Sequence, residues 1–208
     1  MSVQALVTIS ASYGAGGSRV GPLLAERLDV PFAERVMRRN VADRVAGPLT
    51  DADRARQPIG RSLGRALRQI AGERANDSPS SERGDQVADE EYRRMHDQEL
   101  HGFVEDGAVV LGRAAAVVLR DVSHALHVRM SGPVALRIEQ AMLIEDVDHA
   151  TARWRQATED MARDAYVRHF YGVDPEDPQL YHLTIDSTRL PLDACVESIA
   201  AAALRLAG

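Results

Sequence analysis

The chain has 208 residues, 45% of them hydrophobic and 27% charged, and its formal net charge is -6. This composition is typical of one folded domain and excludes a disordered chain, and the acidic balance argues against a nucleic-acid-binding protein. Cys195 is the only cysteine, so an internal disulfide is excluded. We see no signal peptide and no apolar run long enough to span a membrane, so we expect a soluble cytoplasmic protein.

The first predicted element is a buried strand over residues 5–9, which are apolar or β-branched and lead into a cluster of glycines. A helix is expected next, over residues 19–28, because its apolar residues recur at helical spacing. Pro22 falls in the first turn of this helix, where proline is tolerated. Strand, glycine turn and helix therefore follow one another directly.

Further elements are predicted from short apolar runs and from helical periodicity. The strands are expected at residues 30–32, 108–111, 125–130 and 180–185. The helices are expected at residues 34–45, 60–73, 87–104, 134–144, 148–171 and 192–206, with a short one ending at residue 119 and a flexible loop at 76–85. This alternation predicts an α/β fold with a parallel sheet covered by helices on both faces.

The glycine turn after the first strand is the segment with the clearest chemistry. Its backbone N–H groups point toward one spot, and the following helix adds its positive dipole end, which together make a site for phosphate. The residues concerned are Gly14, Ala15, Gly16, Gly17, Ser18 and Arg19. The alternative is a tight connection that needs glycines only for packing, with Ser18 as the helix cap.

This turn departs from the phosphate-binding pattern G-x-x-x-x-G-K-[ST] at two positions. When Ser18 is aligned with the final hydroxyl, which ligates Mg²⁺ in that pattern, Gly17 replaces the lysine and Ala11 replaces the first glycine. The lysine normally supplies positive charge to the β- and γ-phosphates, and here Arg19 is the nearest cation. The turn therefore offers backbone donors without the usual charge.

Five short segments carry a resemblance that spans nearly the whole chain. They are TISASYGAGGSR at 8–19, VLGR at 110–113, LHVRM at 126–130 with Arg137, EDMARDAY at 159–166 and YHLTIDS at 181–187. In this order they resemble the cytidylate kinase-like family of P-loop proteins. The resemblance implies a P-loop NTPase-type three-layer fold with a parallel sheet of about five strands.

The resemblance also implies one domain with three parts. The core is expected at residues 1–33, 105–146 and 178–208, a helical insert that binds the acceptor at 34–104, and a helical lid at 147–177. The insert is longer than a minimal acceptor lobe needs, so self-association into a homo-oligomer through it is a further expectation.

Site roles follow from the same resemblance, residue by residue. It assigns nucleotide phosphates to the glycine turn, Mg²⁺ to Ser18, acceptor binding to Arg35, Arg113 and Asp160, and catalysis to Arg113, Arg155 and Arg163. Structural alternatives stay open. Arg163 and Asp160 are three residues apart on a predicted helix and can pair with each other, Arg113 can form a structural ion pair, and Arg35 can belong to a solvated basic face.

The chain departs from the family at several charged positions. Members usually carry an arginine at position 11, and the aspartate of a Gly-Arg-Asp motif is replaced here by Ala114. The first two positions of the lid motif Arg-Asp-x-x-Asp-x-x-Arg fall at Gln156 and Ala157. Arg153 and Arg155 lie one helical turn or less away and are candidates to replace the lost arginine.

Two functions are compatible with these residues. The resemblance implies a nucleoside monophosphate kinase that transfers the γ-phosphate of ATP to CMP or a related small acceptor with Mg²⁺. The missing cations favour the alternative, a catalytically impaired nucleotide-binding or regulatory protein on the same fold, because phosphoryl transfer depends on charge stabilisation.

Overall fold

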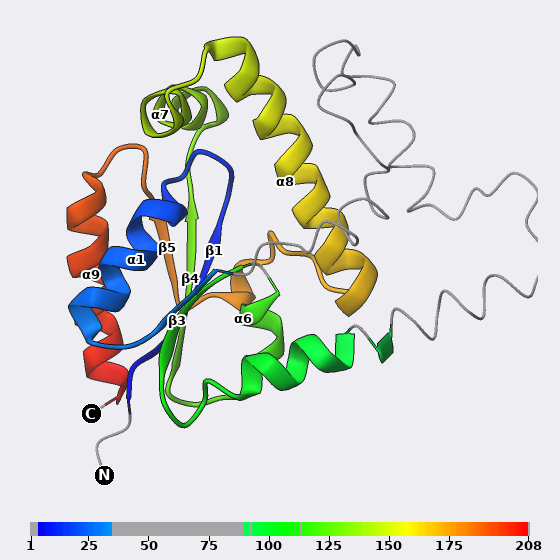
Figure 1. Ribbon diagram of the computed structural model, residues 1–208, viewed down its shortest axis with the longest axis vertical. Coiled ribbons are helices and arrows are strands. Elements are labelled where there is room, and N and C mark those ends of the chain that lie inside the picture. Colours follow the sequence, from blue (N-terminus) through cyan, green and yellow to red (C-terminus); the bar gives the residue numbers. More distant parts are fainter. Residues whose placement is uncertain (1–3, 35–89, 92, 113, 208) are drawn as a thin grey trace, which may run out of the picture.

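A computed structural model describes residues 4–34, 90–91, 93–112 and 114–207. In this part of the chain, five strands form one parallel sheet in the order β2-β3-β1-β4-β5 (Figure 1). The strands are β1 (Leu6–Ala11), β2 (Phe32–Glu34), β3 (Ala108–Leu111), β4 (Ala125–Ser131) and β5 (Leu183–Asp186). The parallel sheet confirms the predicted α/β fold class.

β1 is the central strand of the sheet, where it lies between β3 and β4. Helices bury both of its faces. All six of its residues are buried. Val7 and Ile9 pack toward α1 (Gly17–Leu28) and α9 (Leu192–Ala207), whereas Leu6 packs toward α6 (Ala115–Val118) and the helix over residues 93–101. The alternation along β1 therefore divides the core into the two layers visible in Figure 1.

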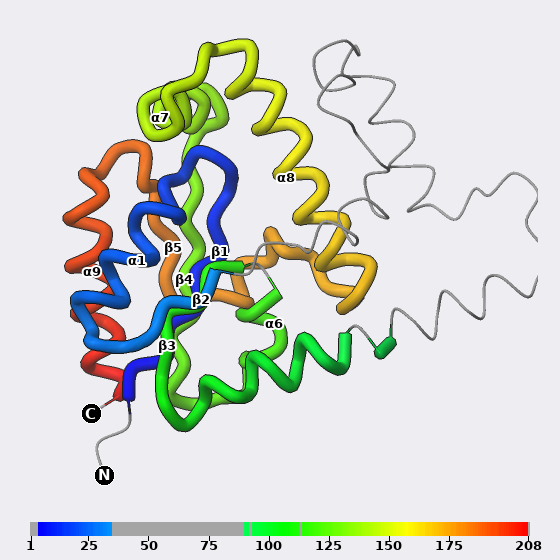
Figure 2. The backbone as a smooth tube through the Cα atoms, viewed as in Figure 1, coloured from blue at the N-terminus to red at the C-terminus, as the bar shows by residue number. Residues whose placement is uncertain are grey.

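Two consecutive helices, α7 (Val134–Glu145) and α8 (His149–Tyr171), follow β4 at the carboxyl end of the sheet. The second of them, α8, then runs back past the sheet toward α6, as the tube in Figure 2 shows. Tyr166, Val167 and Phe170 of α8 pack with Ala114 and Val117 around α6. None of the described helices is long and apolar enough to cross a bilayer.

Two strands, β2 and β5, begin two or three residues later than the sequence-based expectation, and a proline precedes each of them. The strand predicted at residues 30–32 is β2, which begins at Phe32 because Asp29 ends α1 in a left-handed conformation and Pro31 has no N–H to donate. The strand predicted at residues 180–185 begins at Leu183, since Pro178 starts a 3-10 turn over Pro178–Leu180. The helices predicted at residues 60–73 and most of 34–45 lie outside the described residues.

One titratable side chain is buried inside the sheet. His127 of β4 is 2% exposed, its Nδ1 and the Thr8 hydroxyl share a hydrogen bond at 2.9 Å, and its ring stacks on His182. Burial, together with the neighbouring His182, lowers the pKa of His127 from 6.5 to about 4. The neutral ring is therefore the form that the folded core accepts.

The native state should consequently lose stability in acid through His127. Because the folded pKa is depressed, this stability is complete above about pH 6.5 and is lost as the pH falls toward 4, by about 2–3 kcal/mol at pH 4.5. Urea unfolding of wild type and His127→Phe at pH 7 and pH 4.5 measures this loss of unfolding free energy, and His101→Gln, a change at an exposed histidine, is the control. We expect a smaller acid loss in His127→Phe only. An equal loss in all three proteins would contradict the assignment.

Candidate functional site

The glycine turn lies at the carboxyl end of the central strand β1, where open parallel sheets bind their ligands. Gly14 and Gly16 both adopt φ +75°, a left-handed conformation that favours glycine. Between them, the Ala15 N–H closes the turn onto the Ser12 carbonyl at 3.0 Å. A Cβ at Gly14 would overlap the carbonyl of Arg137, so the first of these glycines is also required by packing.

Several donors of this turn are available to a ligand. Within the described ranges, the N–H groups of Gly14, Gly16, Gly17 and Ser18 donate to no other protein group. Gly16 is the N-cap of α1 and no side chain caps the helix, so the alternative role of Ser18 as the cap is wrong. Left-handed residues beside right-handed ones turn successive N–H groups into a concavity that binds anions. The geometry supports the predicted phosphate site.

Gly17 occupies a position that has no room for a side chain. A Cβ built at Gly17 would lie 2.6 Å from the Cβ of Ala11 and 3.1 Å from Cδ1 of Leu111. The methyl group of Ala11 thus fills the space that the first glycine of the phosphate-binding pattern would leave open. The two departures from the pattern are therefore coupled: alanine at position 11 requires glycine at position 17.

Tyr13 anchors the turn to α7 and α8. Its N–H donates to Asp160 Oδ1 at 2.8 Å, its carbonyl accepts from Arg137 Nη1 at 2.7 Å, and its hydroxyl donates to Glu145 at 2.9 Å. Burial, together with the Glu145 carboxylate, raises the pKa of the Tyr13 phenol well above its ordinary value, so the phenol stays protonated. Tyr13 therefore fixes the turn through both its backbone and its side chain.

Asp160, predicted to bind the acceptor, lies in this network. Its Oδ2 accepts from Arg137 Nη1 at 2.7 Å and from Gln156 Nε2 at 3.1 Å. The side chains of Arg137 and Asp160 are 6% and 16% exposed, so this ion pair is largely desolvated. Asp160 therefore links α8 to both the turn and α7, and its pairing with Arg163, one of the structural alternatives, does not occur.

The predicted catalytic arginines of α8 lie near the turn in different ways. Arg163 Nη1 donates to the Ala11 carbonyl at 3.4 Å, and its Nη2 pairs with Glu159 at 2.8 Å. Arg155 pairs with Glu145 at 2.6 Å, the same carboxylate that receives the Tyr13 hydroxyl. Arg163 therefore contacts the last residue of β1, whereas Arg155 reaches the turn through Glu145 and the Tyr13 phenol.

Four predicted site residues remain, namely Ser18, Arg19, Arg35 and Arg113. Ser18 and Arg19 are exposed on the first turn of α1. Arg35 and Arg113 lie outside the described residues, so their roles in acceptor binding and catalysis stay predictions.

Arg129 is a residue at the site that we did not predict from the sequence. It projects from β4, is 5% exposed, and donates to the Ser12 hydroxyl at 3.0 Å and the Ser10 carbonyl at 3.3 Å, while it pairs with Glu176. Its signal was an arginine inside a buried, mostly apolar strand, which is rare unless the charge is paired.

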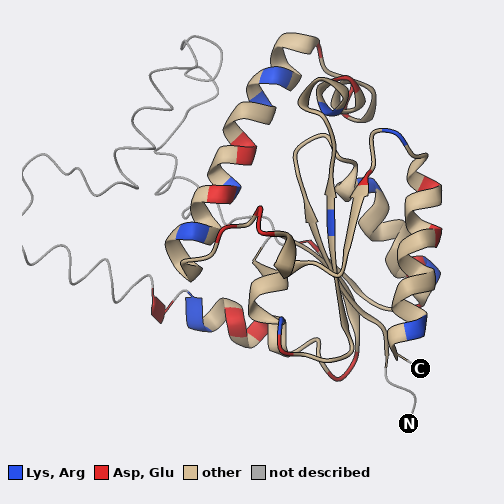
Figure 3. Ribbon diagram, turned by 180° about the vertical axis from the view of Figure 1, so that it is seen from behind, with Lys and Arg blue, Asp and Glu red and all other residues tan. Residues whose placement is uncertain are grey.

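The arginines around the turn are balanced by carboxylates. Arg129, Arg137, Arg155 and Arg163 pair with Glu176, Asp160, Glu145 and Glu159 respectively. Figure 3 shows both signs of charge along α8. A phosphate that enters the turn therefore meets arginines that already have partners.

Comparison with known proteins shows which family the chain belongs to. Residues 6–189 match the model of the cytidylate kinase-like family. The chain belongs to this family. The sequence resemblance is thereby confirmed, and with it the P-loop fold class. Membership supports a kinase-like function.

Individual relatives of this family member are distant. A uronate isomerase of Corynebacterium glutamicum is 26% identical over 138 residues, which cover 66% of this chain but only 27% of that protein. An uncharacterized protein from Eubacterium ventriosum is 18% identical, with a TM-score of 0.61 and coverage of 96% and 98% of the two chains. A gluconokinase from Sinorhizobium meliloti is also 18% identical, with a TM-score of 0.48 and coverage of 100% and 95%. The Eubacterium structure shares the fold of this chain.

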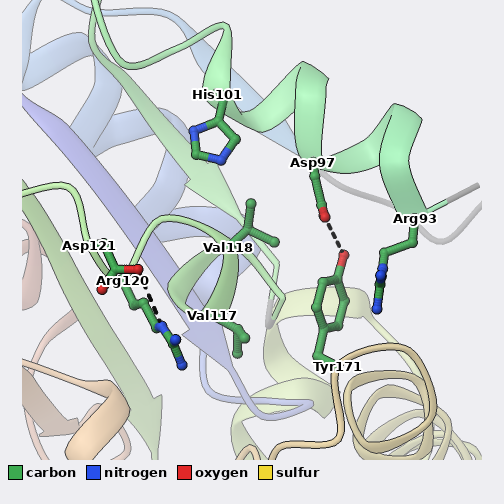
Figure 4. A pocket seen from close by; sticks show the side chains of 8 residues that line it. All are labelled: Arg93, Asp97, His101, Val117, Val118, Arg120, Asp121 and Tyr171. Atoms are coloured by element: carbon green, nitrogen blue, oxygen red, sulfur yellow. Dashed lines mark hydrogen bonds and ion pairs between the residues drawn. The ribbon is translucent and has the colours of Figure 1, made fainter. Parts of the chain in front are cut away.

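A second hollow, of about 300 Å³, lies between residues 93–101, α6 and the end of α8 (Figure 4). Two of the residues that line it are hydrogen-bonded, since the Tyr171 hydroxyl donates to Asp97 at 3.0 Å. Its lining residues are Arg93, Asp97, His101, Val117, Val118, Arg120, Asp121 and Tyr171. None of these belongs to the glycine turn.

Proposed function

We propose that this member of the cytidylate kinase-like family binds ATP with Mg²⁺ at the glycine turn and transfers the γ-phosphate to CMP or a related small acceptor. The observation that carries the proposal is the set of N–H groups of Gly14, Gly16, Gly17 and Ser18 that donate to no protein group among the described residues. Such donors at the end of a central parallel strand suit the β- and γ-phosphates of a nucleotide.

The residues of the turn also fit the proposed metal. Among the described residues, no cluster of His, Cys, Asp or Glu can hold an ion by itself. Mg²⁺ in kinases of this type needs no such cluster, because nucleotide phosphates, water and one hydroxyl supply most of its ligands. Ser18, exposed in the first turn of α1, would supply that hydroxyl. When bound, the ion would neutralise phosphate charge.

Arg163 would supply the positive charge that the turn itself lacks. Its guanidinium contacts the carbonyl of Ala11, and Ala11 in turn lies against Gly17, the lysine position of the pattern. Arg155 lies farther along the same network and would support it. The role of Arg35, Arg113 and Asp160 in acceptor binding stays a prediction. The helical insert at 34–104, the helical lid at 147–177 and the cytoplasmic location also stay predictions.

A second candidate is a nucleotide-binding protein without turnover. The observation in its favour is that Arg129, Arg137, Arg155 and Arg163, which lie around the turn, are each paired with a carboxylate. Removing a charged contact from a transition state commonly costs about 10²–10³ in rate, so arginines that stay paired would leave little catalysis.

The two candidates are separated by calorimetry and a coupled ADP-release assay on the full chain. We expect Mg²⁺-ATP to bind and ADP release to rise on addition of CMP from a panel of nucleoside monophosphates. Binding without ADP release for any acceptor would favour the second candidate. Absence of binding by folded wild type would contradict both.

A further inference from the structure

Two side chains of α7 hold the outward carbonyls of the glycine turn. Arg137 Nη1 donates to the Tyr13 carbonyl at 2.7 Å, and Gln140 Nε2 donates to the Gly14 carbonyl at 2.9 Å. The two residues are three apart, so they lie on the same face of α7. Successive peptide groups of the turn are thus fixed from one side.

Fixing a carbonyl also fixes the N–H of the same peptide group. The peptide unit is planar and trans, so its C=O and N–H point in opposite directions. The unit from Tyr13 to Gly14 has its carbonyl on Arg137, which directs the Gly14 N–H away from α7. The unit from Gly14 to Ala15 has its carbonyl on Gln140, and its N–H closes the turn on Ser12 at 3.0 Å.

Gln140 also lies against the next glycine of the turn. A Cβ at Gly16 would lie 3.3 Å from Gln140 Nε2, so the amide sits beside the left-handed residue that starts α1. Without this donor, the Ala15 N–H bond to Ser12 would hold the Gly14 peptide alone, and a rotation that broke it would turn the negative end of the Gly14 carbonyl toward the concavity, where it would oppose a phosphate. Donors aligned before the ligand arrives cost no reorganisation when it binds.

We propose that Gln140 is a positioning residue for the phosphate site, which holds the Gly14 peptide so that the turn keeps its N–H groups aimed at the anion. Arg137 does the same for the preceding peptide, but it also carries the buried pair with Asp160. Gln140 is half-buried and takes part in no charged pair of the described chain, so it gives the cleaner test. The inference rests on the proposed function.

The test measures binding of inorganic tripolyphosphate and of ATP, each with Mg²⁺, by calorimetry on the full chain. Gln140→Leu removes the donor at nearly constant volume, and Gln140→His restores an N–H at a similar reach. Glu139→Leu, an exposed neighbour on α7, is the matched control. We expect Gln140→Leu to weaken both ligands about five- to tenfold, Gln140→His to recover most of the affinity, and Glu139→Leu to match wild type.

The outcomes separate this inference from the proposed function. Failure of wild type to bind either ligand would overturn both together. Equal binding by wild type and Gln140→Leu would overturn the positioning role and leave the function intact. If Gln140→Leu and Gln140→His are equally weak and both melt at lower temperature, the side chain supports the fold only, which also overturns the role.

Discussion

Gly17→Lys, which restores the lysine of the phosphate-binding pattern, is expected to destabilise the protein by about 2–3 kcal/mol, the usual cost of an overpacked core. The reason is steric, because a Cβ at Gly17 meets the methyl group of Ala11 at 2.6 Å and Leu111 at 3.1 Å. Gly17 lies within α1, so its backbone conformation is no obstacle to a side chain. Ala11→Gly should therefore rescue the lysine variant.

Urea unfolding of wild type, both single variants and the double variant measures this coupling. We expect Ala11→Gly alone to be mildly destabilising, and the double variant to recover most of the loss, with a coupling free energy of about 1–3 kcal/mol. The double variant also places an ammonium group at the turn, so its affinity for Mg²⁺-ATP should rise about tenfold. Additive destabilisation by the two changes would show that positions 11 and 17 do not share space.

Much of the architecture could be predicted because it depends on local patterns. The apolar run of β1, the glycines and the periodic residues of α1 give strand, turn and helix in order, and the structure has them in that order. The strand over 108–111 was predicted with its observed bounds, since it is short, wholly apolar and closed by Gly112. The starts of β2 and β5 were missed where a proline precedes the strand, because missing donors and local turns override apolar character, and β1 runs to Ala11, two residues beyond its predicted end.

The contacts that complete the site could not be predicted, because they join residues far apart in the chain. Spacing on one helix favoured a pair between Asp160 and Arg163. Instead Asp160 pairs with Arg137 of α7, and Arg163 pairs with Glu159 one turn away. Which arginine pairs with Asp160 depends on how α7 and α8 pack against the turn. No single segment of the sequence determines that packing. The same holds for Ala11 and Gly17, which look like two independent losses in the sequence and form one packing contact in the structure.

Arg163→Met is expected to lower the rate of ADP release about 10²–10³-fold, if the guanidinium beside Ala11 supplies the charge that Gly17 lacks. Stability should change little, because the pair with Glu159 is about two-fifths exposed on both sides and such pairs contribute about 1 kcal/mol or less. Methionine keeps the aliphatic bulk of the side chain, so the change removes charge more than packing. Loss of rate with unchanged melting is therefore the expected result.

Arg168→Met is the matched control, since Arg168 also lies on α8 and pairs with a carboxylate, Asp174, at 2.8 Å without reaching the turn. The Arg168→Met variant should release ADP at the wild-type rate. Glu159→Gln removes the carboxylate that competes for Arg163, and its rate should equal or exceed that of wild type. If Arg163→Met and Arg168→Met behave alike, the charge at the phosphates comes from elsewhere. A Glu159→Gln variant slower than wild type would mean that the pair orients Arg163, because the carboxylate would then be needed to hold the guanidinium at Ala11.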